Sequence, residues 1–360
     1  MRNILKDRRF FVFKAGSVGF VAIALALLCV FSCNNLIVLG GGSLVIAMPG
    51  TRAATASSYT IELTGTNGTP QSKTLTGGTT AQFDDLAPDT YSIVVKGMDT
   101  NDKVVLGGAS SATVVAGKTA STTVELVEVV NNFDSLRQAM TAGGTVYVVN
   151  DITVTESLTI NQDVTIRALD KDVTLNHTGS SNLFTVQNSA TLTIGGGDYR
   201  LTVDGNGQPR EVALLQIKGG TVDLYGTITN GSSTKTAGGV EIASSSTLYM
   251  YDGATVSNCE CTDGWGRGGA IAVRSGAVMN MYGGTITGNR CYCAAAIYVE
   301  GGTFNMSGGT ITGNTATSSS TVDSDRPSAV EITSTGKFTQ TGGSITGNSP
   351  SDIANKSTLQ

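Results

Sequence analysis

Short segments in which apolar and polar residues alternate run along the chain from Ser57, separated by Gly, Asn and Asp. Over residues 57–128 these segments include Tyr59–Leu63 and Tyr91–Val95. A period of two with this punctuation is typical of antiparallel strands that expose one face to solvent. A stretch of about 70 residues suits a sandwich of roughly six or seven strands. We therefore predict a small β-sandwich over residues 57–128.

From residue 144 the alternation becomes a repeat. The phrase Gly-Thr-Ile-Thr-Gly-Asn recurs with variations, and two other short apolar segments precede it in each repeat. Three strands in about 25 residues form one coil of a parallel β-helix, and a single coil cannot bury its own apolar side chains. We predict an all-β chain with a right-handed parallel β-helix of about eight or nine coils over residues 144–355. The aliphatic centres of the phrase are Ile228, Val256, Ile286, Ile311 and Ile345.

Gly and Asn mark the corners between these strands. Gly allows a positive φ at a sharp corner, and Asn tolerates the same geometry while its amide can bond to the Asn of the next coil. Residues 131–143 lack the period of two and begin with an Asn or Asp cap. We expect a short amphipathic helix there that covers the open end of the stacked coils, and a polar tail over 356–360.

The N-terminal segment has the pattern of an export signal. Residues 1–14 are basic and residues 15–31 are apolar and uncharged. The run ends in Val30-Phe31-Ser32-Cys33, which resembles a bacterial lipobox. The resemblance implies a lipoprotein signal peptide over 1–33, a diacylated Cys33 that anchors the chain in a membrane, and a location at the bacterial cell envelope, on its outer surface.

Two alternatives to lipidation stay open. The segment could remain as an uncleaved signal anchor, or ordinary signal peptidase could cleave after Ala54-Thr55-Ala56. Residues 34–56 are assigned to a tether, although Leu36–Met48 is more apolar than lipoprotein tethers usually are.

Charge excludes one class of partner. Beyond residue 32 the chain carries 18 basic and 27 acidic residues and has no basic patch. Neutralising phosphates supplies most of the affinity for nucleic acid, so we expect no nucleic-acid partner. The low content of charged residues, 14%, and the 46 glycines also exclude a coiled coil or a helical bundle.

Several motifs resemble those of known families. Phe83–Tyr91 is similar to the F-x-x-L-x-P-G-x-Y corner of transthyretin-like and fibronectin-like surface modules, with Asp89 in place of Gly. Residues 131–348 resemble the pectin-lyase-like superfamily. Gly268–Ile271 is similar to the GGAI motif of polymorphic outer-membrane adhesins, whose partner FxxN motif matches Ile286–Asn289 only loosely. These resemblances imply a non-catalytic surface lipoprotein that serves as an adhesin or structural rod and contacts host or matrix components, with the sandwich as a spacer.

A glycan-binding or glycan-cleaving protein is the alternative, because the pectin-lyase-like fold also carries lyases and hydrolases. Such a site needs converging carboxylates, and the candidates are Asp198, Asp204 and Asp223. Leu201–Gly207 resembles the I-D-G-N-G turn of polygalacturonases, but the other signatures of that family are missing. The single histidine, His177, stands in a turn-like context and is expected to be solvated. We therefore predict no catalytic residue, no metal site and no cofactor.

One segment offers residues for ligand binding. Trp265 lies between glycines on an expected corner loop, with Asp263 and Arg267 beside it. The flat face of the indole could stack on a sugar. Alternatively, the side chain folds back over the flank of the coil.

The cysteines lie in two Cys-x-Cys pairs that are one coil apart: Cys259 with Cys261, and Cys291 with Cys293. In an oxidising, exported context this favours cross-coil disulfides, whose connectivity the sequence does not fix. Four thiolates could instead bind zinc.

Overall fold

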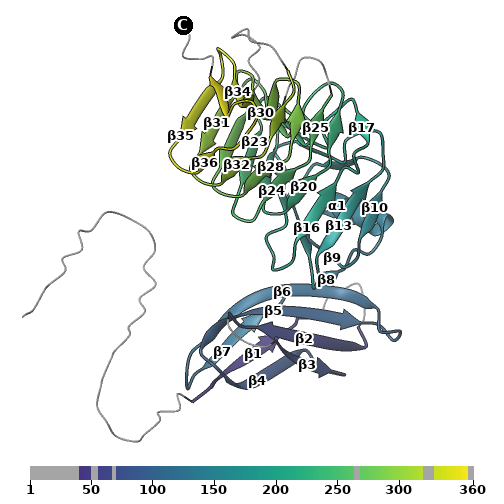
Figure 1. Cartoon of the computed structure of the whole chain (residues 1–360). Helices are drawn as coiled ribbons and strands as arrows, with labels where there is room; N and C mark the ends of the chain where they lie inside the picture. Colours follow the sequence, from purple (N-terminus) through teal and green to yellow (C-terminus); the bar gives the residue numbers. More distant parts are fainter. Residues whose placement is uncertain (1–39, 50–55, 67–69, 263–267, 319–327, 356–360) are drawn as a thin grey trace, which may run out of the picture. The chain divides into compact units, whose positions relative to one another are not determined.

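The computed structural model describes residues 40–49, 56–66, 70–262, 268–318 and 328–355. Its strands form two kinds of β-structure in succession (Figure 1). Each has its own hydrophobic core. Among the described residues there is no helix long and apolar enough to cross a membrane.

The N-terminal part is a β-sandwich of two sheets around a core that includes Ile46, Ile61 and Ile93. One sheet has the order β4-β1-β7 and the other the order β3-β2-β5-β6-β8. The strands are β1 (Gly42–Ala47), β2 (Ser58–Thr64), β3 (Gln71–Leu75), β4 (Thr80–Leu86), β5 (Asp89–Met98), β6 (Val104–Val114), β7 (Thr119–Thr123) and β8 (Val127–Glu128).

The position of β1 corrects the assignment of residues 34–56 to a tether. β1 pairs antiparallel with β4 and parallel with β7, so it is the central strand of its sheet. Its alternate residues Leu44 and Ile46, and Met48 after it, are fully buried. The apolar character of this segment therefore completes the sandwich core.

The corner between β4 and β5 contains the segment Phe83–Tyr91, and three of its residues are buried. Phe83, Leu86 and Tyr91 all lie in the core. The Tyr91 hydroxyl donates a hydrogen bond of 3.0 Å to the Ala87 carbonyl oxygen and ties the corner to the following strand. Such a bond from a buried tyrosine to nearby backbone is a known device for fixing sandwich corners.

The helix α1 (Phe133–Ala142) precedes the repeats. Asn132 is its N-cap: the side chain accepts a hydrogen bond from the Ser135 amide, and Ser135 accepts one from the Asn132 amide in return. The buried side chains Leu136 and Met140 join the apolar core of the repeats. The helix thus covers the first coil.

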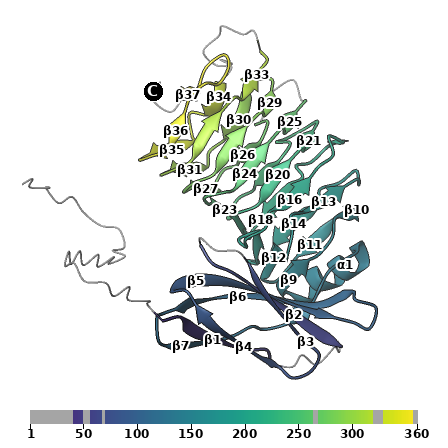
Figure 2. The same cartoon turned by 60° about the horizontal axis from the view of Figure 1, so that its bottom comes forward.

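The repeats form a parallel β-helix, which confirms the predicted fold class. Its three long sheets contain eight parallel strands each, so successive coils stack at about 4.8 Å. Figure 2 shows the strands of successive coils side by side. The first sheet consists of β10 (Ile152–Val154), β13 (Val173–His177), β16 (Leu201–Asp204), β20 (Thr227–Thr229), β24 (Thr255–Ser257), β28 (Thr285–Thr287), β32 (Thr310–Thr312) and β36 (Ser344–Ile345).

The second and third sheets have the same order along the stack. The second sheet consists of β11 (Leu158–Ile160), β14 (Phe184–Gln187), β18 (Leu215–Lys218), β22 (Val240–Ile242), β26 (Ile271–Val273), β30 (Ala294–Val299), β34 (Ser328–Ile332) and β37 (Ile353–Asn355). The third sheet consists of β9 (Gly144–Val148), β12 (Val164–Ala168), β15 (Thr191–Ile194), β19 (Thr221–Leu224), β23 (Thr247–Met250), β27 (Val278–Met281), β31 (Thr303–Met306) and β35 (Lys337–Gln340).

A shorter corner sheet links the first and second sheets in the middle coils. It consists of β17 (Pro209–Arg210), β21 (Ser232–Ser233), β25 (Glu260–Cys261), β29 (Arg290–Cys291) and β33 (Thr315–Ala316).

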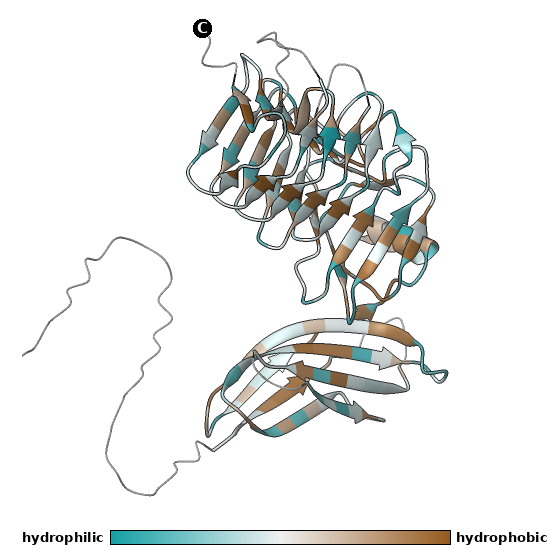
Figure 3. Ribbon diagram, viewed as in Figure 1, coloured by the Kyte–Doolittle hydropathy of each residue, from teal (hydrophilic) through white to brown (hydrophobic). Residues whose placement is uncertain are grey.

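Aliphatic columns fill the interior of the stack. In the first sheet, Ile228 pairs in register with Val256, Val256 with Ile286, and Ile286 with Ile311. All four are fully buried. Figure 3 shows apolar segments, in brown, recurring in successive coils. Because the interior is occupied by packed side chains, any functional site must lie on the outward-facing residues or the corners.

Candidate functional site

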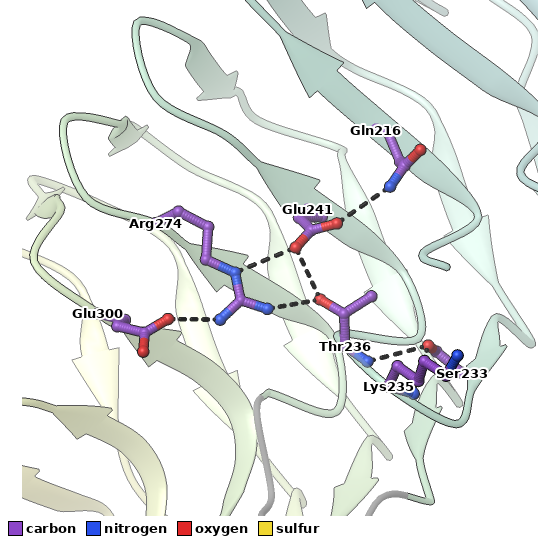
Figure 4. Close-up of polar contacts among 7 residues, drawn as sticks. All are labelled: Gln216, Ser233, Lys235, Thr236, Glu241, Arg274 and Glu300. Carbon is purple, nitrogen blue, oxygen red and sulfur yellow. Dashed lines mark hydrogen bonds and ion pairs between the residues drawn. The ribbon is translucent and has the colours of Figure 1, made fainter. Parts of the chain in front are cut away.

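The outer side of the second sheet carries a network of charged and polar side chains, here called the Arg274 cluster. Glu241 is the central residue of β22, between the inward-facing Val240 and Ile242, so the period of two places it outward. Gln216 pairs in register with Glu241 one coil earlier. The cluster consists of Gln216, Thr236, Glu241, Arg274 and Glu300 (Figure 4).

Arg274 links two carboxylates. Its Nε lies 3.0 Å from Glu241 Oε1 and its Nη1 lies 2.6 Å from Glu300 Oε2. Its Nη2 donates to the Thr236 hydroxyl over 2.8 Å. Thr236 in turn donates to Glu241 Oε1 over 3.0 Å, and the amide of Gln216 donates to Glu241 Oε2 over 3.0 Å.

The electrostatics of the cluster keep Glu241 ionised. Burial alone raises the pKa of Glu241, but the charge of Arg274 and the hydrogen bonds from Gln216, Thr236 and Arg274 together hold it below its ordinary value. The pKa of Arg274 is raised, because its ion pairs with Glu241 and Glu300 outweigh the cost of its burial. A carboxylate so stabilised is a poor general acid. The arrangement fits a structural role: it attaches the corner that contains Thr236 to the sheet.

The three candidate carboxylates lie on different elements of the β-helix. Asp204 ends β16 in the first sheet and accepts hydrogen bonds from the Asn206 amide and the Asn230 side chain. Asp223 lies in β19 of the third sheet and accepts one from the Tyr251 hydroxyl over 3.3 Å. Burial raises the pKa of Asp223. Asp198 lies in the turn between β15 and β16. Asp204 and Asp223 thus lie in different sheets, and Asp198 lies in a turn.

The prediction that His177 is solvated is wrong. His177 is fully buried at the end of β13. Its Nδ1 lies 3.0 Å from the Val154 carbonyl oxygen and its Nε2 lies 2.9 Å from that of Ser181. Burial lowers its pKa, and the neighbouring positive charge of Arg210 lowers it further. The Gly and Ser residues that follow His177 in the sequence suggested a turn, but the turn begins only after the strand.

The four described cysteines are buried and are not joined by disulfides in the structure, so the expected disulfides are absent from it. Glu260 pairs with Arg290, which places Cys261 opposite Cys291 one coil away. In the same register Cys259 lies opposite Asn289, whose side chain accepts a hydrogen bond from the Cys259 amide. The two Cys-x-Cys pairs are therefore offset by two residues.

The pKa of two of these thiols, Cys259 and Cys291, is raised, and a raised pKa lowers the reactivity of a thiol. The pKa of Cys291 is raised, first by a hydrogen bond with Cys261 and then by burial. Burial raises the pKa of Cys259 to about 12. Within the described ranges, no three His, Cys, Asp or Glu residues gather in a way that could hold a metal ion, so the described cysteines do not form the alternative zinc site.

Some predicted site residues lie outside the described residues. These are Cys33 of the lipobox and the binding candidates Asp263, Trp265 and Arg267.

Sequence reasoning missed two groups on the outer surface: the Arg274 cluster and a set of four tyrosines, Tyr225, Tyr249, Tyr251 and Tyr282, beside the third sheet. The tyrosines had a detectable signal, because a Tyr directly follows the strand in three successive repeats. The Arg274 cluster had none, because its members are between 5 and 84 positions apart in the sequence and only the stacking of coils brings them together.

Comparison of the chain with models of known protein families, with curated proteins and with solved structures found no match. Function must therefore be argued from the residues alone.

Proposed function

We propose that the chain is a non-catalytic bacterial surface lipoprotein, anchored by Cys33, which acts as an adhesin or structural rod. The observation that carries the non-catalytic part is the Arg274 cluster. Both carboxylate oxygens of Glu241 accept hydrogen bonds from the protein itself, from Gln216, Thr236 and Arg274. Acid–base catalysis requires a carboxyl group that can exchange a proton with a substrate, whereas the oxygens of Glu241 are already bonded within the protein.

The role of β1 supports processing at Cys33. Cleavage after Ala56, the ordinary signal-peptidase alternative, would remove β1, which is the central strand between β4 and β7. It would also remove the buried side chains of Leu44 and Ile46. Cleavage before Cys33 leaves this strand in the mature protein.

The anchor is tested by expressing the full chain in a bacterium and following its partition into Triton X-114. We expect the wild type in the detergent phase and labelled by a fatty-acid analogue. The Cys33→Ala variant should lose the label. Cys29→Ala is the matched control, because Cys29 lies four residues earlier in the apolar run and should not be lipidated. Equal labelling of wild type and Cys33→Ala would refute the anchor.

The absence of catalysis is tested by incubating the purified chain with polygalacturonate and other acidic polysaccharides. We expect no new reducing ends and no unsaturated products. The surface role is tested separately, by labelling intact cells with an antibody and by binding of the chain to immobilised host matrix proteins and glycans. Product formation would favour the glycan-cleaving alternative, and failure to reach the cell surface would contradict the role as an adhesin or rod.

A further inference from the structure

Three tyrosines occupy the same corner in three successive coils. Each directly follows a strand of the third sheet, and each backbone amide donates to a carbonyl of the previous coil: Tyr225 to Ile194, Tyr251 to Leu224, and Tyr282 to Met250. The equivalent position is Gly195 in the preceding coil and Ser307 in the following one, whose amides donate to Ile166 and Met281. The aromatic series is therefore limited to three coils.

The rings form a contiguous cluster on the protein surface, in which Tyr225 and Tyr251 are stacked and Tyr251 and Tyr282 are tilted by 42°. The centroids of Tyr225 and Tyr251 are 4.3 Å apart and their planes differ by 4°. Tyr282 continues the series at 5.6 Å from Tyr251, and Tyr249, which points outward from β23, lies 6.0 Å from Tyr282. The outer members are the most accessible: Tyr225 is 37% and Tyr282 is 50% exposed. Exposed aromatic side chains that are held rigidly by stacking are suited to binding at low cost in conformational entropy.

A hollow of about 510 Å³ adjoins the Tyr225 end of the tyrosine cluster. The previous coil contributes three consecutive glycines there, Gly195–Gly197, in place of side chains. A β-carbon on Gly196 would lie 3.4 Å from the Tyr225 ring, so a side chain at that position would contact the ring. The volume falls within the usual range for small-ligand sites, about 300–1,000 Å³.

The other residues that line the hollow are mainly polar. They include Asp172, Asp198 and Asp252, with Arg200 as the basic residue. Hydroxyl groups can donate to carboxylates and accept from a guanidinium. The excess of carboxylates disfavours an anionic ligand by repulsion. The chemistry thus combines an aromatic surface for C–H groups with several acceptors for hydroxyl groups.

A sugar fits this combination better than a protein does. The large apolar side chains exposed on the described part of the β-helix are three tyrosines, Tyr225, Tyr282 and Tyr292, and one aliphatic residue, Ile353 near the C-terminus. No exposed large aliphatic residue adjoins the rings within the part of the chain that the structure describes, whereas the neighbouring outward positions are polar, as in Asp223 and Asn280. Protein interfaces instead have an apolar core from which charged residues are depleted.

We propose that the hollow beside Tyr225 binds an uncharged sugar unit of a glycan, with the apolar face of the sugar on the tyrosine ring and its hydroxyls on Asp172, Asp252 and Arg200. This inference rests on the proposed surface function and names the class of ligand that the adhesin would recognise.

The test measures binding of the full-length chain to immobilised neutral oligosaccharides (cellohexaose, a mannan and a β-galactan) and to polygalacturonate. We expect at least one neutral glycan to bind and polygalacturonate to bind at least tenfold more weakly. Tyr225→Ala should weaken binding of that glycan about tenfold or more, whereas Tyr225→Phe, which keeps the ring, should stay within about threefold of wild type. Tyr292→Ala is the matched control, because Tyr292 is 40% exposed and lies beside the corner sheet.

A second measurement covers the case in which Tyr225→Ala perturbs folding. Tetranitromethane nitrates accessible tyrosines, and mass spectrometry of the wild type gives the extent at Tyr225 and Tyr292. The bound neutral glycan should protect Tyr225 and leave Tyr292 unchanged. The inference is overturned if no neutral glycan binds, if polygalacturonate binds best, or if Tyr225 and Tyr292 respond alike in both measurements. Lipid labelling of Cys33 and surface exposure of the chain would be unaffected by such results, so the failure of this inference is distinct from the failure of the proposed function.

Discussion

At the residue scale, the position directly after the strands of the first sheet determines how each coil turns. Asn230 and Asn258 hold it with φ of 53° and 52°, whereas Gly288, Gly313 and Gly347 hold it in the later coils with φ between 66° and 71°. All five residues take the left-handed conformation. This conformation costs Asn less than most residues, and it costs Gly nothing.

The residue after this position forms an asparagine ladder in the later coils. Asn289 donates from its side chain to Asn314 over 2.9 Å, and Asn314 donates in the same way to Asn348. In the earlier coils Gly231 and Cys259 stand at the equivalent position. The repeat phrase predicted asparagine stacking at every coil end, but Asn230 and Asn258 are shifted by one residue and take the turn position instead.

We predict that Asn314→Ala lowers the free energy of unfolding by about 2–3 kcal/mol, because it leaves buried polar groups of Asn289 and of the backbone without a partner. Asn314 is fully buried and donates to the Ile286 carbonyl oxygen as well as to Asn348. Denaturant unfolding followed by circular dichroism measures this. Asn305→Ala is the control: its side chain donates to Asn280 on the outer face, and the loss should stay below about 1 kcal/mol. Equal losses would contradict the prediction.

His177 predicts a dependence of stability on pH. Burial, followed by the charge of Arg210, lowers its pKa in the folded state, so below about pH 6.5 the unfolded chain binds more protons than the folded chain. Stability should therefore decrease as the pH falls below about 6.5, by at most about 1.4 kcal/mol per pH unit from this group. His177 is the only histidine in the chain, so His177→Gln should flatten the curve of melting temperature between pH 7 and 5. Identical curves for the two proteins would argue against this linkage.

At the scale of the elements, the strands were predictable from the sequence, whereas the contacts that the corner residues make with neighbouring coils were not. A strand such as β22 follows from the alternation of Val240, Glu241 and Ile242, because inward residues must be apolar in every coil. The corner that brings Thr236 next to Glu241 depends on which coil lies beside which. The sequence pattern does not contain that information, and for the same reason it did not predict the Arg274 cluster.

We predict that Arg274→Gln destabilises the protein by about 2 kcal/mol or more at pH 7, because Glu241 keeps its partly buried charge and loses its cation. The side chains of Arg274 and Glu241 are 17% and 20% exposed. The pKa of Glu241 is lowered in the folded state, so the stabilisation is present above about pH 4.5 and is lost as the pH falls through the lowered value. The difference between wild type and variant should therefore shrink at pH 3.

The control for Arg274 is a more exposed ion pair in the same β-helix. Arg290 lies 3.6 Å from Glu260, and the two side chains are 60% and 45% exposed. Arg290→Gln should change stability by less than about 0.5 kcal/mol at either pH. A similar effect of both substitutions would show that the Arg274 cluster is no more important than an ordinary surface pair.

The pairing of β25 with β29 refines the expectation for the cysteines. Adjacent strands bring the α-carbons of Cys261 and Cys291 to about 5 Å, which a disulfide can bridge. If the chain folds in an oxidising envelope, an envelope thiol–disulfide oxidoreductase can accept the two electrons and two protons. We predict one bridge between Cys261 and Cys291, and no disulfide at Cys259 or Cys293. Thiol titration of the exported protein in denaturant should then find two fewer thiols before reduction than after, and an unchanged count would refute the bridge.

At the scale of the whole molecule, the sequence predicted the order of the two β-structures but placed the start of the sandwich too late. Ile61 and Ile93 signalled strands because they lie in the alternating segments Tyr59–Leu63 and Tyr91–Val95. Leu44 and Ile46 follow the lipobox-like Cys33, where a tether is expected, although the apolar character of Leu36–Met48 is unusual for a tether. Their burial between β4 and β7 is a tertiary effect, which local periodicity does not reveal.

We predict that a chain beginning at Ser57 has an unfolded sandwich, because it lacks β1. Limited proteolysis followed by mass spectrometry should show rapid loss of fragments from residues 57–128 and persistence of fragments from 131–355, which have a core of their own. A chain beginning at Asn34 is the control and should resist cleavage in both regions. Equal resistance of the two chains would show that β1 is dispensable.

The repeats keep their strands in register although their lengths differ. The spacing between the aliphatic centres of successive first-sheet strands is 28, 30, 25 and 34 residues, yet Ile228, Val256, Ile286, Ile311 and Ile345 stay in one column. Most of the variation in length is taken up outside the three long sheets, and one register shift lies within the second sheet, between Ala294 and Ile297 of β30 against β34. Mutation can therefore replace or lengthen the peripheral loops while the supporting scaffold is inherited unchanged.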